Sequence, residues 1–283
     1  MKYIDLHVHS NVSDGTFTPS ELVKEAQRCN LSAFALTDHD TTAGVAEAMA
    51  AAKNTEVEVI AGAEISAAYK NKDIHILGLL IDPDSPALNA SLQQALKERD
   101  ARNEKMANNL AAAGLSISME DLRAFFPPNT VFTRAHFAKY LLETGQIGSI
   151  ADAFNKYLHA DSPYYVPREY ITPEQTIALI KQAGGIPVLA HPLIYRLPEQ
   201  ELDCLIGRLK EAGLQGIEVF YSNNTGFDEG ILRRYANKYD LLPTGGSDFH
   251  GSNKPQISLG TGRGNLKVPY SVLDKLKEHQ ARH

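Results

Sequence analysis

Ile4-Asp5-Leu6-His7-Val8-His9-Ser10 alternates apolar and polar residues and runs into a Gly- and Ser-rich turn that holds Asp14. The alternation predicts a β-strand, on which His7 and His9 point to the same face and can hold one cation between two imidazoles. Asp5 lies on that face too, as a candidate hydrogen-bond partner of His7 or for a structural hydrogen bond. A lone His-x-His pair can equally be the polar end of a strand, so the metal interpretation depends on the rest of the chain.

The composition is that of an ordinary globular protein with a sizeable core. The chain has 283 residues, 43% of them hydrophobic and 22% charged, which is enough for one barrel or two domains. Its formal net charge of -6 gives no general attraction to nucleic acid or to anionic membranes, so a polyanion must be bound locally.

Targeting signals and cysteines point to one compartment. Met1 leads directly into the first predicted strand, and no apolar run reaches membrane length, so we expect a cytoplasmic protein without a membrane partner. Cys29 and Cys204 fall in helical patterns without Cys-x-x-Cys spacing, which fits reduced, buried thiols.

Apolar strand patterns alternate with amphipathic helix patterns along most of the chain. The predicted strands cover about 4–10, 33–37, 57–66, 73–81, 186–190, 216–220 and 242–246. The predicted helices between them cover about 19–30, 45–53, 173–182, 198–212 and 228–239, with none between the third and fourth strands. This order predicts an α/β fold, a distorted seven-stranded (β/α) barrel, in which the chemistry lies at the C-terminal ends of the strands.

One stretch departs from this alternation. A long charged helix is predicted from about Pro86 to Gly114, followed by short helices near 119–126, 133–143 and 150–157. We interpret residues 98–170 as an inserted helical cap that supplies substrate selectivity. Residues 1–97 and 171–283 then form the barrel with the metal site.

The histidines sort to the strand ends. Six of the ten fall at or just past predicted strands, together with three carboxylates; the nine residues are His7, His9, Asp14, His39, Glu64, His75, His191, Asp248 and His250. One ion takes about four to six ligands, so nine converging side chains predict two or three divalent ions that share bridging carboxylates. Imidazole and carboxylate suit manganese, which we expect, and also zinc or iron.

Four short motifs resemble those of the PHP family, named for polymerase and histidinol phosphatase domains. They are His7-Val8-His9, Thr37-Asp38-His39-Asp40, Ala190-His191-Pro192 and Gly246-Ser247-Asp248-Phe249-His250. The resemblance covers about 1–82 and 172–260 and implies a distorted seven-stranded barrel with up to three metals. It implies three ligand sets, which are His7, His9, Glu64 and Asp248; then Glu64, His75 and His191; then Asp14, His39 and His250.

Clustered cations activate water and neutralise a phosphoryl group, so the expected reaction is hydrolysis of a phosphate ester. We expect Asp38, His191 and Asp248 to be catalytic, with Asp38 orienting His39 or relaying a proton, unless Asp38 is an ordinary loop acid. Many histidinol phosphatases have a histidine where this chain has Asp14, so that activity is less favoured.

The predicted cap contains an anion-binding helix start. Thr133 is the expected N-cap, which places Arg134 and His136 in the first turn, where free amides and the helix dipole favour an anion. The segment 133–138 resembles the cap helix of a PHP subgroup of nucleoside 3′,5′-bisphosphate phosphatases and of RNase AM, a 5′-to-3′ exoribonuclease. The resemblance implies that Arg134 and His136 hold a 5′-phosphate while the 3′ ester is cleaved. Further phosphate or sugar contacts are expected from Ser222, Asn223 and Asn224.

Other classes stay open at this stage. A histidinol-phosphatase-like phosphomonoesterase and a metal-dependent amidohydrolase could use the same kind of barrel with a metal site. A non-enzymatic module of a polymerase is a third class. The anion-binding cap helix favours a phosphorylated substrate, and the complete ligand set disfavours a non-enzymatic module. The expected partner is a nucleotide or the 5′ end of a short RNA, without stable binding of duplex DNA.

Overall fold

The computed structural model describes residues 2–70, 72–128, 130–159, 161–167 and 171–282. Within them lies one eight-stranded sheet in the order β7-β6-β5-β4-β3-β2-β1-β8. The strands are β1 (Tyr3–Val8), β2 (Leu31–Leu36), β3 (Glu58–Tyr69), β4 (Lys72–Leu79), β5 (Ile186–Leu189), β6 (Gly216–Tyr221), β7 (Leu242–Gly246) and β8 (Val268–Pro269). The sheet closes after β7, where the Asp248 amide donates to the His7 carbonyl over 2.9 Å and the His9 amide to the Phe249 carbonyl over 3.0 Å. The expected α/β barrel is confirmed.

The number and direction of the strands differ from the expected seven-stranded pattern. The extra strand, β8, has only two residues and pairs with β1 in antiparallel fashion, so it is too short to show an alternation in the sequence. β3 and β4 form an antiparallel hairpin, and β4 is also antiparallel to β5. An antiparallel pair needs no crossover helix, which is why no helix pattern lies between these two strands.

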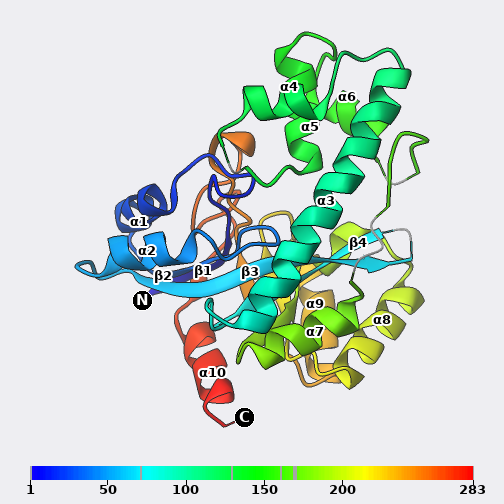
Figure 1. Cartoon of the computed structure of the whole chain (residues 1–283). Coiled ribbons are helices and arrows are strands. Elements are labelled where there is room, and N and C mark those ends of the chain that lie inside the picture. Colours follow the sequence, from blue (N-terminus) through cyan, green and yellow to red (C-terminus); the bar gives the residue numbers. More distant parts are fainter. Residues whose placement is uncertain (1, 71, 129, 160, 168–170, 283) are drawn as a thin grey trace.

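Helices surround the sheet (Figure 1). They are α1 (Pro19–Arg28), α2 (Val45–Ala52), α7 (Pro173–Gln182), α8 (Glu199–Glu211), α9 (Gly226–Lys238) and α10 (Ser271–Gln280). The start of α1 is set by a capping box, in which the Thr18 hydroxyl accepts from the Glu21 amide over 3.1 Å and the Glu21 carboxylate accepts from the Thr18 amide over 2.8 Å. Thr172 and Gln175 do the same for α7, as the sequence predicts.

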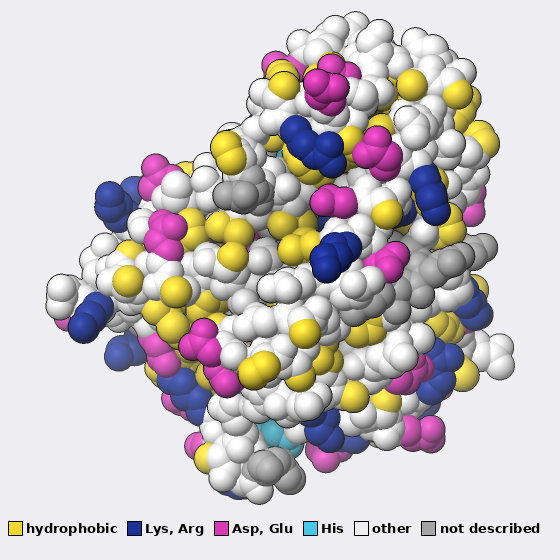
Figure 2. Space-filling model, in the orientation of Figure 1, with side chains coloured by type: hydrophobic (Ala, Val, Ile, Leu, Met, Phe, Trp, Pro, Cys, Tyr) yellow, Lys and Arg dark blue, Asp and Glu magenta, His cyan; other side chains and the backbone are white. Residues whose placement is uncertain are grey.

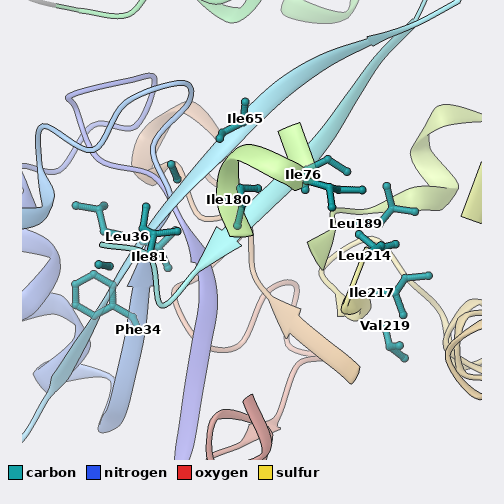
Figure 3. Close-up of a cluster of buried hydrophobic side chains, with 14 of the residues drawn as sticks. Phe34, Leu36, Ile65, Ile76, Ile81, Ile180, Leu189, Leu214, Ile217 and Val219 are labelled. Atoms are coloured by element: carbon teal, nitrogen blue, oxygen red, sulfur yellow. The ribbon is translucent and has the colours of Figure 1, made fainter. Parts of the chain in front are cut away.

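Two apolar clusters hold the barrel together. The larger one packs the strands against the surrounding helices; Figure 3 shows Ile180 of α7 beside β3 and β4, with Leu189 and Ile217 further along the sheet. The second joins β1 to α10, through the fully buried Ile4 and Leu273 among others. Burial of each such side chain contributes about 1.5–3 kcal/mol relative to exposure.

A further group of helices lies beyond the barrel. The helix α3 (Pro86–Ala112) has 27 residues, so it is about 40 Å long, and in Figure 1 it runs from beside α7 to the far helices. Those helices are α4 (Met119–Phe125), α5 (Arg134–Glu143), α6 (Ile150–Ala153) and the π-helical η1 (Phe154–Leu158). They pack with the end of α3 around a third apolar cluster that contains Met106, Phe137 and Leu141.

No helix in the described ranges is long and apolar enough to cross a membrane. Cys204 is exposed and Cys29 only half-buried, so the expectation of two buried thiols is wrong. On α8 the buried face is formed by Leu202, Leu205 and Leu209 among others, and Cys204 lies off that face.

Close packing of β7 against β1 generates the first prediction. A Cβ added at Gly246 would overlap the Cβ and the backbone nitrogen of His7. Gly246→Ala should therefore lower the free energy of unfolding by about 1–3 kcal/mol and displace His7. The measurement is urea unfolding, with Gly230→Ala as the control. At Gly230, within α9, an added Cβ meets nothing within 4 Å, so this variant should gain about 0.5–1 kcal/mol. Equal stability of Gly246→Ala and the wild type would contradict the prediction.

Candidate metal centre

Strand ends bring the nine predicted ligand residues together. His7 lies in β1 and His9 just after it, Asp14 in the turn before α1, His39 after β2, Glu64 in β3, His75 in β4, His191 after β5, and Asp248 and His250 after β7. All of them except His75 are buried. Backbone pairing sets part of the geometry, because His39 and Glu64 form a β-bridge in which the Glu64 amide donates to the Asp38 carbonyl over 3.1 Å.

The ligand atoms form overlapping groups. Among the described residues, four groups have their nitrogen and oxygen atoms within 4.8 Å of one another. The groups are His9, Asp14, His39 and His250; then His7, His9 and Asp248; then His7, Glu64 and His191; then His39, Glu64 and His75. Because neighbouring groups share His7, His9, His39 or Glu64, the arrangement suits several adjacent ions rather than one.

Glu64 lies in the middle of these groups. Its Oε1 is 2.7 Å from His75 Nδ1 and 2.9 Å from His191 Nε2. Its Oε2 is 3.2 Å from His9 Nε2 and 3.1 Å from His39 Nδ1. The two oxygens of one carboxylate thus face different imidazoles, which is the geometry that a bridging ligand needs. Which ion each side chain binds stays a prediction.

The donor atoms fit divalent cations. His7 Nε2, both ring nitrogens of His9, His39 Nδ1 and Asp14 Oδ1 are buried without a hydrogen-bond partner in the described part of the chain. Buried polar atoms without partners cost free energy, and a cluster of imidazoles and carboxylates is the ligand set that transition metals prefer. The residues present therefore fit a centre of two or more divalent ions.

At Glu64, Asp248 and His39, electrostatics favours the protonation states that bind metals. Burial by itself would raise the pKa of Glu64, but the charges of His75, His39 and His7 outweigh it and hold that pKa well below its usual range. The pKa of Asp248 is likewise lowered, against the effect of burial, by Lys254 and His250. Burial lowers the pKa of His39 well below its usual value. Ionised carboxylates beside a neutral imidazole are the forms that coordinate a cation.

Glu218 is a functional residue that the sequence reasoning missed. It is fully buried in β6, accepts from His7 Nδ1 over 3.0 Å, and accepts from the His191 amide over 2.8 Å. The contact fixes the His7 tautomer with Nε2 toward Glu64 and Asp248. Burial would lower the pKa of His7, but Glu218 and Glu64 raise it well above its usual value. The available signal was a lone carboxylate in the apolar run Gly216–Phe220.

Two acids near the ligands have structural partners. Asp5 accepts from the amides of Ser247 and Gly260 over 2.8 and 2.7 Å, so the hydrogen-bond partner of the His7 ring is Glu218, and Asp5 ties β1 to the segment after β7. Asp38 accepts from the Ser10 amide and hydroxyl over 2.8 and 2.6 Å, and from the Ser13 hydroxyl over 2.5 Å. These contacts brace the turn that carries Asp14, rather than the His39 ring that Asp38 was expected to orient.

The start of α5 reaches the metal centre through its N-cap. The Thr133 hydroxyl donates to Asp14 Oδ2 over 3.0 Å, and the Thr133 amide donates to His136 Nδ1 over 3.0 Å. The His136 ring is buried against Phe126 and Phe132, at centroid distances of 4.7 and 5.5 Å. Burial lowers the pKa of His136 to about 4, so the ring is neutral at pH 7. A neutral ring is no cation, so Arg134 is the charged side chain in this first helical turn, and a phosphate contact of His136 stays a prediction.

Arg134 lies at the open side of the centre. Its guanidinium donates to the Leu158 carbonyl over 3.1 Å, lies 3.7 Å from Asp73 Oδ2 and stacks over the Tyr165 ring at 5.1 Å. Its side chain is 29% exposed, so it keeps surface for a ligand. These partners hold the guanidinium in one place, which lowers the entropy that a bound anion would cost.

The polar loop after β6 is used internally. The Ser222 hydroxyl donates to the Ser247 carbonyl over 2.5 Å, and the Asn224 amide group donates to the Val219 carbonyl over 2.9 Å. Asn223 is exposed and accepts from Arg263 over 2.9 Å. Ser222 thus supports the backbone next to Asp248. None of the three residues lines the cavity over the centre, so their expected substrate contacts stay a prediction.

One cavity of about 310 Å³ opens over the centre. Its wall includes the candidate ligands Asp14, His39, His75 and His250. The basic side chains that line it are Arg99, Arg102, Arg134 and Lys254. Lys254 Nζ also lies 2.7 Å from Asp248 Oδ2. A concave site that joins metal ligands to four basic side chains is suited to an anionic ligand.

Comparison with known proteins agrees with this geometry. The sequence model of the PHP domain matches residues 5–242, which is more than half of the chain. The chain belongs to the PHP family. The match includes seven of the nine candidate ligands and the whole of β6, which carries Glu218; Asp248 and His250 lie just beyond residue 242.

Two PHP relatives align over nearly the whole chain. A 3′,5′-nucleoside bisphosphate phosphatase of Chromobacterium violaceum is 36% identical over 92% of this chain and 91% of its own length. The 5′-3′ exoribonuclease Rnm of Escherichia coli is 36% identical over 90% of this chain and 87% of its own length. Both alignments span the barrel and the helices beyond it.

Two solved structures share the fold. One from Bifidobacterium adolescentis, described as a candidate metal-dependent phosphoesterase, has a TM-score of 0.84 and 32% identity and covers 97% of this chain and 95% of that one. One from Chromobacterium violaceum, described as an amidohydrolase with bound sulfate and no metal, has a TM-score of 0.88 and 33% identity and covers 98% and 96%. At these identities the barrel and the far helices are alike in all three.

The contact of Glu218 with His7 generates a prediction about metal affinity. Glu218→Gln keeps the size of the side chain but weakens its hydrogen bond with the His7 ring. Metal affinity or turnover should therefore fall about 10- to 100-fold. Metal titration followed by a phosphatase assay measures both. The control is Glu58→Gln, because Glu58 accepts hydrogen bonds from Tyr270 and Lys277, away from the centre. Unchanged metal affinity in Glu218→Gln would remove this role.

The buried His136 generates a prediction about pH. Its pKa is about 4 in the folded protein and 6.5 in an exposed reference state, so the unfolded chain binds the proton more tightly. Stability should therefore be lost as pH falls from about 6.5 to about 4, by roughly 3 kcal/mol from this group. His136→Gln keeps an acceptor for the Thr133 amide but cannot titrate.

Urea unfolding of metal-free protein between pH 4 and 7 measures this difference. The wild type should lose stability relative to His136→Gln as the pH falls, and the gap should close near pH 7. Parallel pH profiles of the two proteins would show that His136 is not buried in its neutral form.

Proposed function

We propose that this metal-dependent phosphoesterase hydrolyses the 3′ ester of nucleotides that carry a 5′-phosphate. The substrates would be nucleoside 3′,5′-bisphosphates and short 5′-phosphorylated RNA, degraded from the 5′ end. Two PHP relatives at 36% identity, named as a bisphosphate phosphatase and an exoribonuclease, support this choice. Both names describe hydrolysis of a phosphate ester, in a nucleoside bisphosphate or in RNA.

One observation carries the proposal. A single cavity joins four candidate metal ligands to Arg134, a fixed guanidinium that comes from a different group of helices. A substrate with two phosphates can place one over the metal centre and the other on Arg134. An arginine binds phosphate through a planar fork of donors, which is why this pairing favours a second phosphate over a neutral group.

The barrel and the helices beyond it would have different functions. Residues 1–97 and 171–283 would form the catalytic barrel, and residues 98–170 would form a cap that selects the substrate. The cap touches the centre through Thr133, whose hydroxyl donates to Asp14, and through Lys139, which bonds Asn253 over 3.0 Å. These contacts support a cap that is fixed on the metal side of the barrel.

The side chains have separate roles in the reaction. Divalent ions in such a centre supply activation of water and neutralisation of phosphoryl charge. Glu64 and Asp248 would supply the negative charge that holds the cations, and Glu218 orients His7 and accepts from the backbone amide of His191. Lys254 Nζ adds a positive charge beside Asp248 at the cavity wall, where a phosphoryl oxygen would lie. We assign manganese to the centre, with zinc and iron as alternatives, and the cytoplasm as location.

The charge distribution limits the size of the substrate. On the face seen in Figure 2, basic and acidic side chains alternate without a broad area of one sign. The formal net charge of -6 adds no long-range attraction for a polyanion. Short RNA ends that enter the cavity are therefore preferred over long structured RNA or duplex DNA.

An amidohydrolase is the second candidate, because a solved structure with a TM-score of 0.88 carries that description. The same structure contains sulfate, which resembles a phosphoryl group in shape and charge. The four basic side chains of the cavity also favour an anionic substrate. A histidinol-phosphatase-like activity needs no second phosphate, so the 5′-phosphate dependence separates it from the proposal.

The proposal predicts a dependence on the 5′-phosphate. Adenosine 3′,5′-bisphosphate should be cleaved at least about tenfold better than adenosine 3′-monophosphate, because a hydrogen bond between charged groups contributes about 1.5–3 kcal/mol. Arg134→Ala should remove most of this preference, lowering kcat and raising KM on the bisphosphate, since the contact also positions the scissile ester. Phosphate release measures both.

The control variant is Arg123→Ala, which removes an exposed arginine of α4 and should leave the preference intact. A second arm uses a 5′-phosphorylated oligoribonucleotide and its 5′-hydroxyl twin, with products resolved over time. Mononucleotides should appear from the 5′ end of the phosphorylated strand only. Equal rates on the two monomers, or internal cuts in the RNA, would refute the 5′-end selectivity.

A further inference from the structure

The cavity over the metal centre has a small apolar part. Most of its lining is charged or polar, and the larger apolar side chains in it are Phe154 and Ile194. They come from different places in the fold, because Phe154 begins η1 beyond the barrel and Ile194 lies in the short 3-10 turn η2 (Pro192–Tyr195) after β5. The cavity wall thus receives one of these apolar side chains from each of two parts of the fold.

Ile194 is exposed although its backbone is firmly held. Its side chain is 48% exposed, while its neighbours Pro192 and Tyr195 are buried. The Ile194 amide donates to the His191 carbonyl over 3.1 Å, and the Tyr195 hydroxyl donates to the Ala190 carbonyl over 2.7 Å. The turn therefore presents an isoleucine to the cavity at a fixed distance from the ligand His191, and water is a poor partner for that side chain.

Phe154 is also held at the cavity by its surroundings. It packs partly on the third apolar cluster, in which its neighbours Ala153 and Leu158 are fully buried. It begins a π-helical turn, a geometry that is rare and often found at functional sites. Arg134 links the same turn to the anion site, since its guanidinium donates to the Leu158 carbonyl. A phenyl ring on the rim is thus tied to the element that carries the proposed phosphate contact.

We propose that Phe154 and Ile194 form a subsite for the nucleobase of the substrate. The inference rests on the proposed function, because it takes a nucleotide as the ligand. A nucleotide with phosphates at the metal centre and at Arg134 has one flat, largely apolar group left, and these side chains are the larger apolar ones in the same cavity. The base lies against the Phe154 ring, with Ile194 closing the other side.

The chemistry of this subsite predicts tolerance toward the base. Stacking on an aromatic ring works for any base, since each has a π-face, and it needs no hydrogen bond to a base edge. Adenine, guanine, cytosine and uracil nucleotides should therefore be cleaved with similar efficiency, within about tenfold. That is the property a nuclease working along an RNA end needs, and it separates recognition of the base from recognition of the phosphates.

The test compares substrates with and without a base. The proteins are the metal-loaded wild type, Phe154→Ala and Ile194→Ala, and the substrates are adenosine 3′,5′-bisphosphate and its base-free analogue, 1-deoxyribose 3,5-bisphosphate. Phe154→Ala should lower kcat/KM on the nucleotide by roughly 5- to 100-fold, and Ile194→Ala by about 3- to 10-fold. Both variants should stay within about twofold of the wild type on the base-free analogue.

Two controls separate base contact from general damage. Ile150→Ala changes a partly exposed isoleucine at the start of α6, and Phe227→Ala changes a phenylalanine that is 77% exposed on α9; neither lines the cavity. Both should behave as the wild type on both substrates. Equal losses on the two substrates in Phe154→Ala, or no loss on either, would overturn the base subsite. A wild type that cleaves neither substrate would overturn the proposed function and the subsite with it.

Discussion

The burial of Glu64 is the constraint on which the site depends. A carboxylate that is 1% exposed must be compensated by nearby charge, and here the compensation comes from imidazoles on β1, β4 and the segments after β2 and β5. Those elements are far apart in the sequence, so the barrel must close correctly before the charge is satisfied. The same oxygens that need compensation can bridge cations. The buried Glu64 carboxylate therefore links closure of the barrel to the capacity of the site to bind metal.

The helices beyond the barrel are joined to this centre by buried polar contacts. Arg99 of α3 forms an ion pair with Asp40, and both side chains are nearly inaccessible. Asp40 also accepts from the Ser66 amide over 2.8 Å, and its own amide donates to the Glu64 carbonyl over 2.9 Å. A long helix thus connects the third apolar cluster to the backbone around the central carboxylate. The proposed substrate-selecting helices and the candidate metal centre are therefore held in a fixed relation, as the proposed substrate with two phosphates requires.

Two residues in function-like patterns have hydrogen-bond partners within the fold. Asp38 in the Thr37–Asp40 motif braces a turn, and His136 in the first turn of α5 caps the helix with a neutral ring. A sequence pattern reports which donors and acceptors are near a helix start or a strand end. It does not report which of them is already used by a neighbouring backbone amide, because that depends on the packing of segments far apart in the chain. Glu218 is the opposite case. It is a carboxylate inside an apolar strand, and only the packing of the strands places it within hydrogen-bond distance of His7.

The sequence by itself determined the alternation of strands and helices, the departure of residues 98–170 from it, and the nine side chains at the strand ends. These depend on local periodicity and on residue chemistry, both of which can be seen in one dimension. Only the tertiary structure decided that β3 and β4 form an antiparallel hairpin, that β8 exists, that Glu218 holds His7, and that Phe154 and Ile194 share a cavity with Arg134. Each of these is a long-range contact whose free energy arises from burial and compensation between segments, which no local pattern encodes.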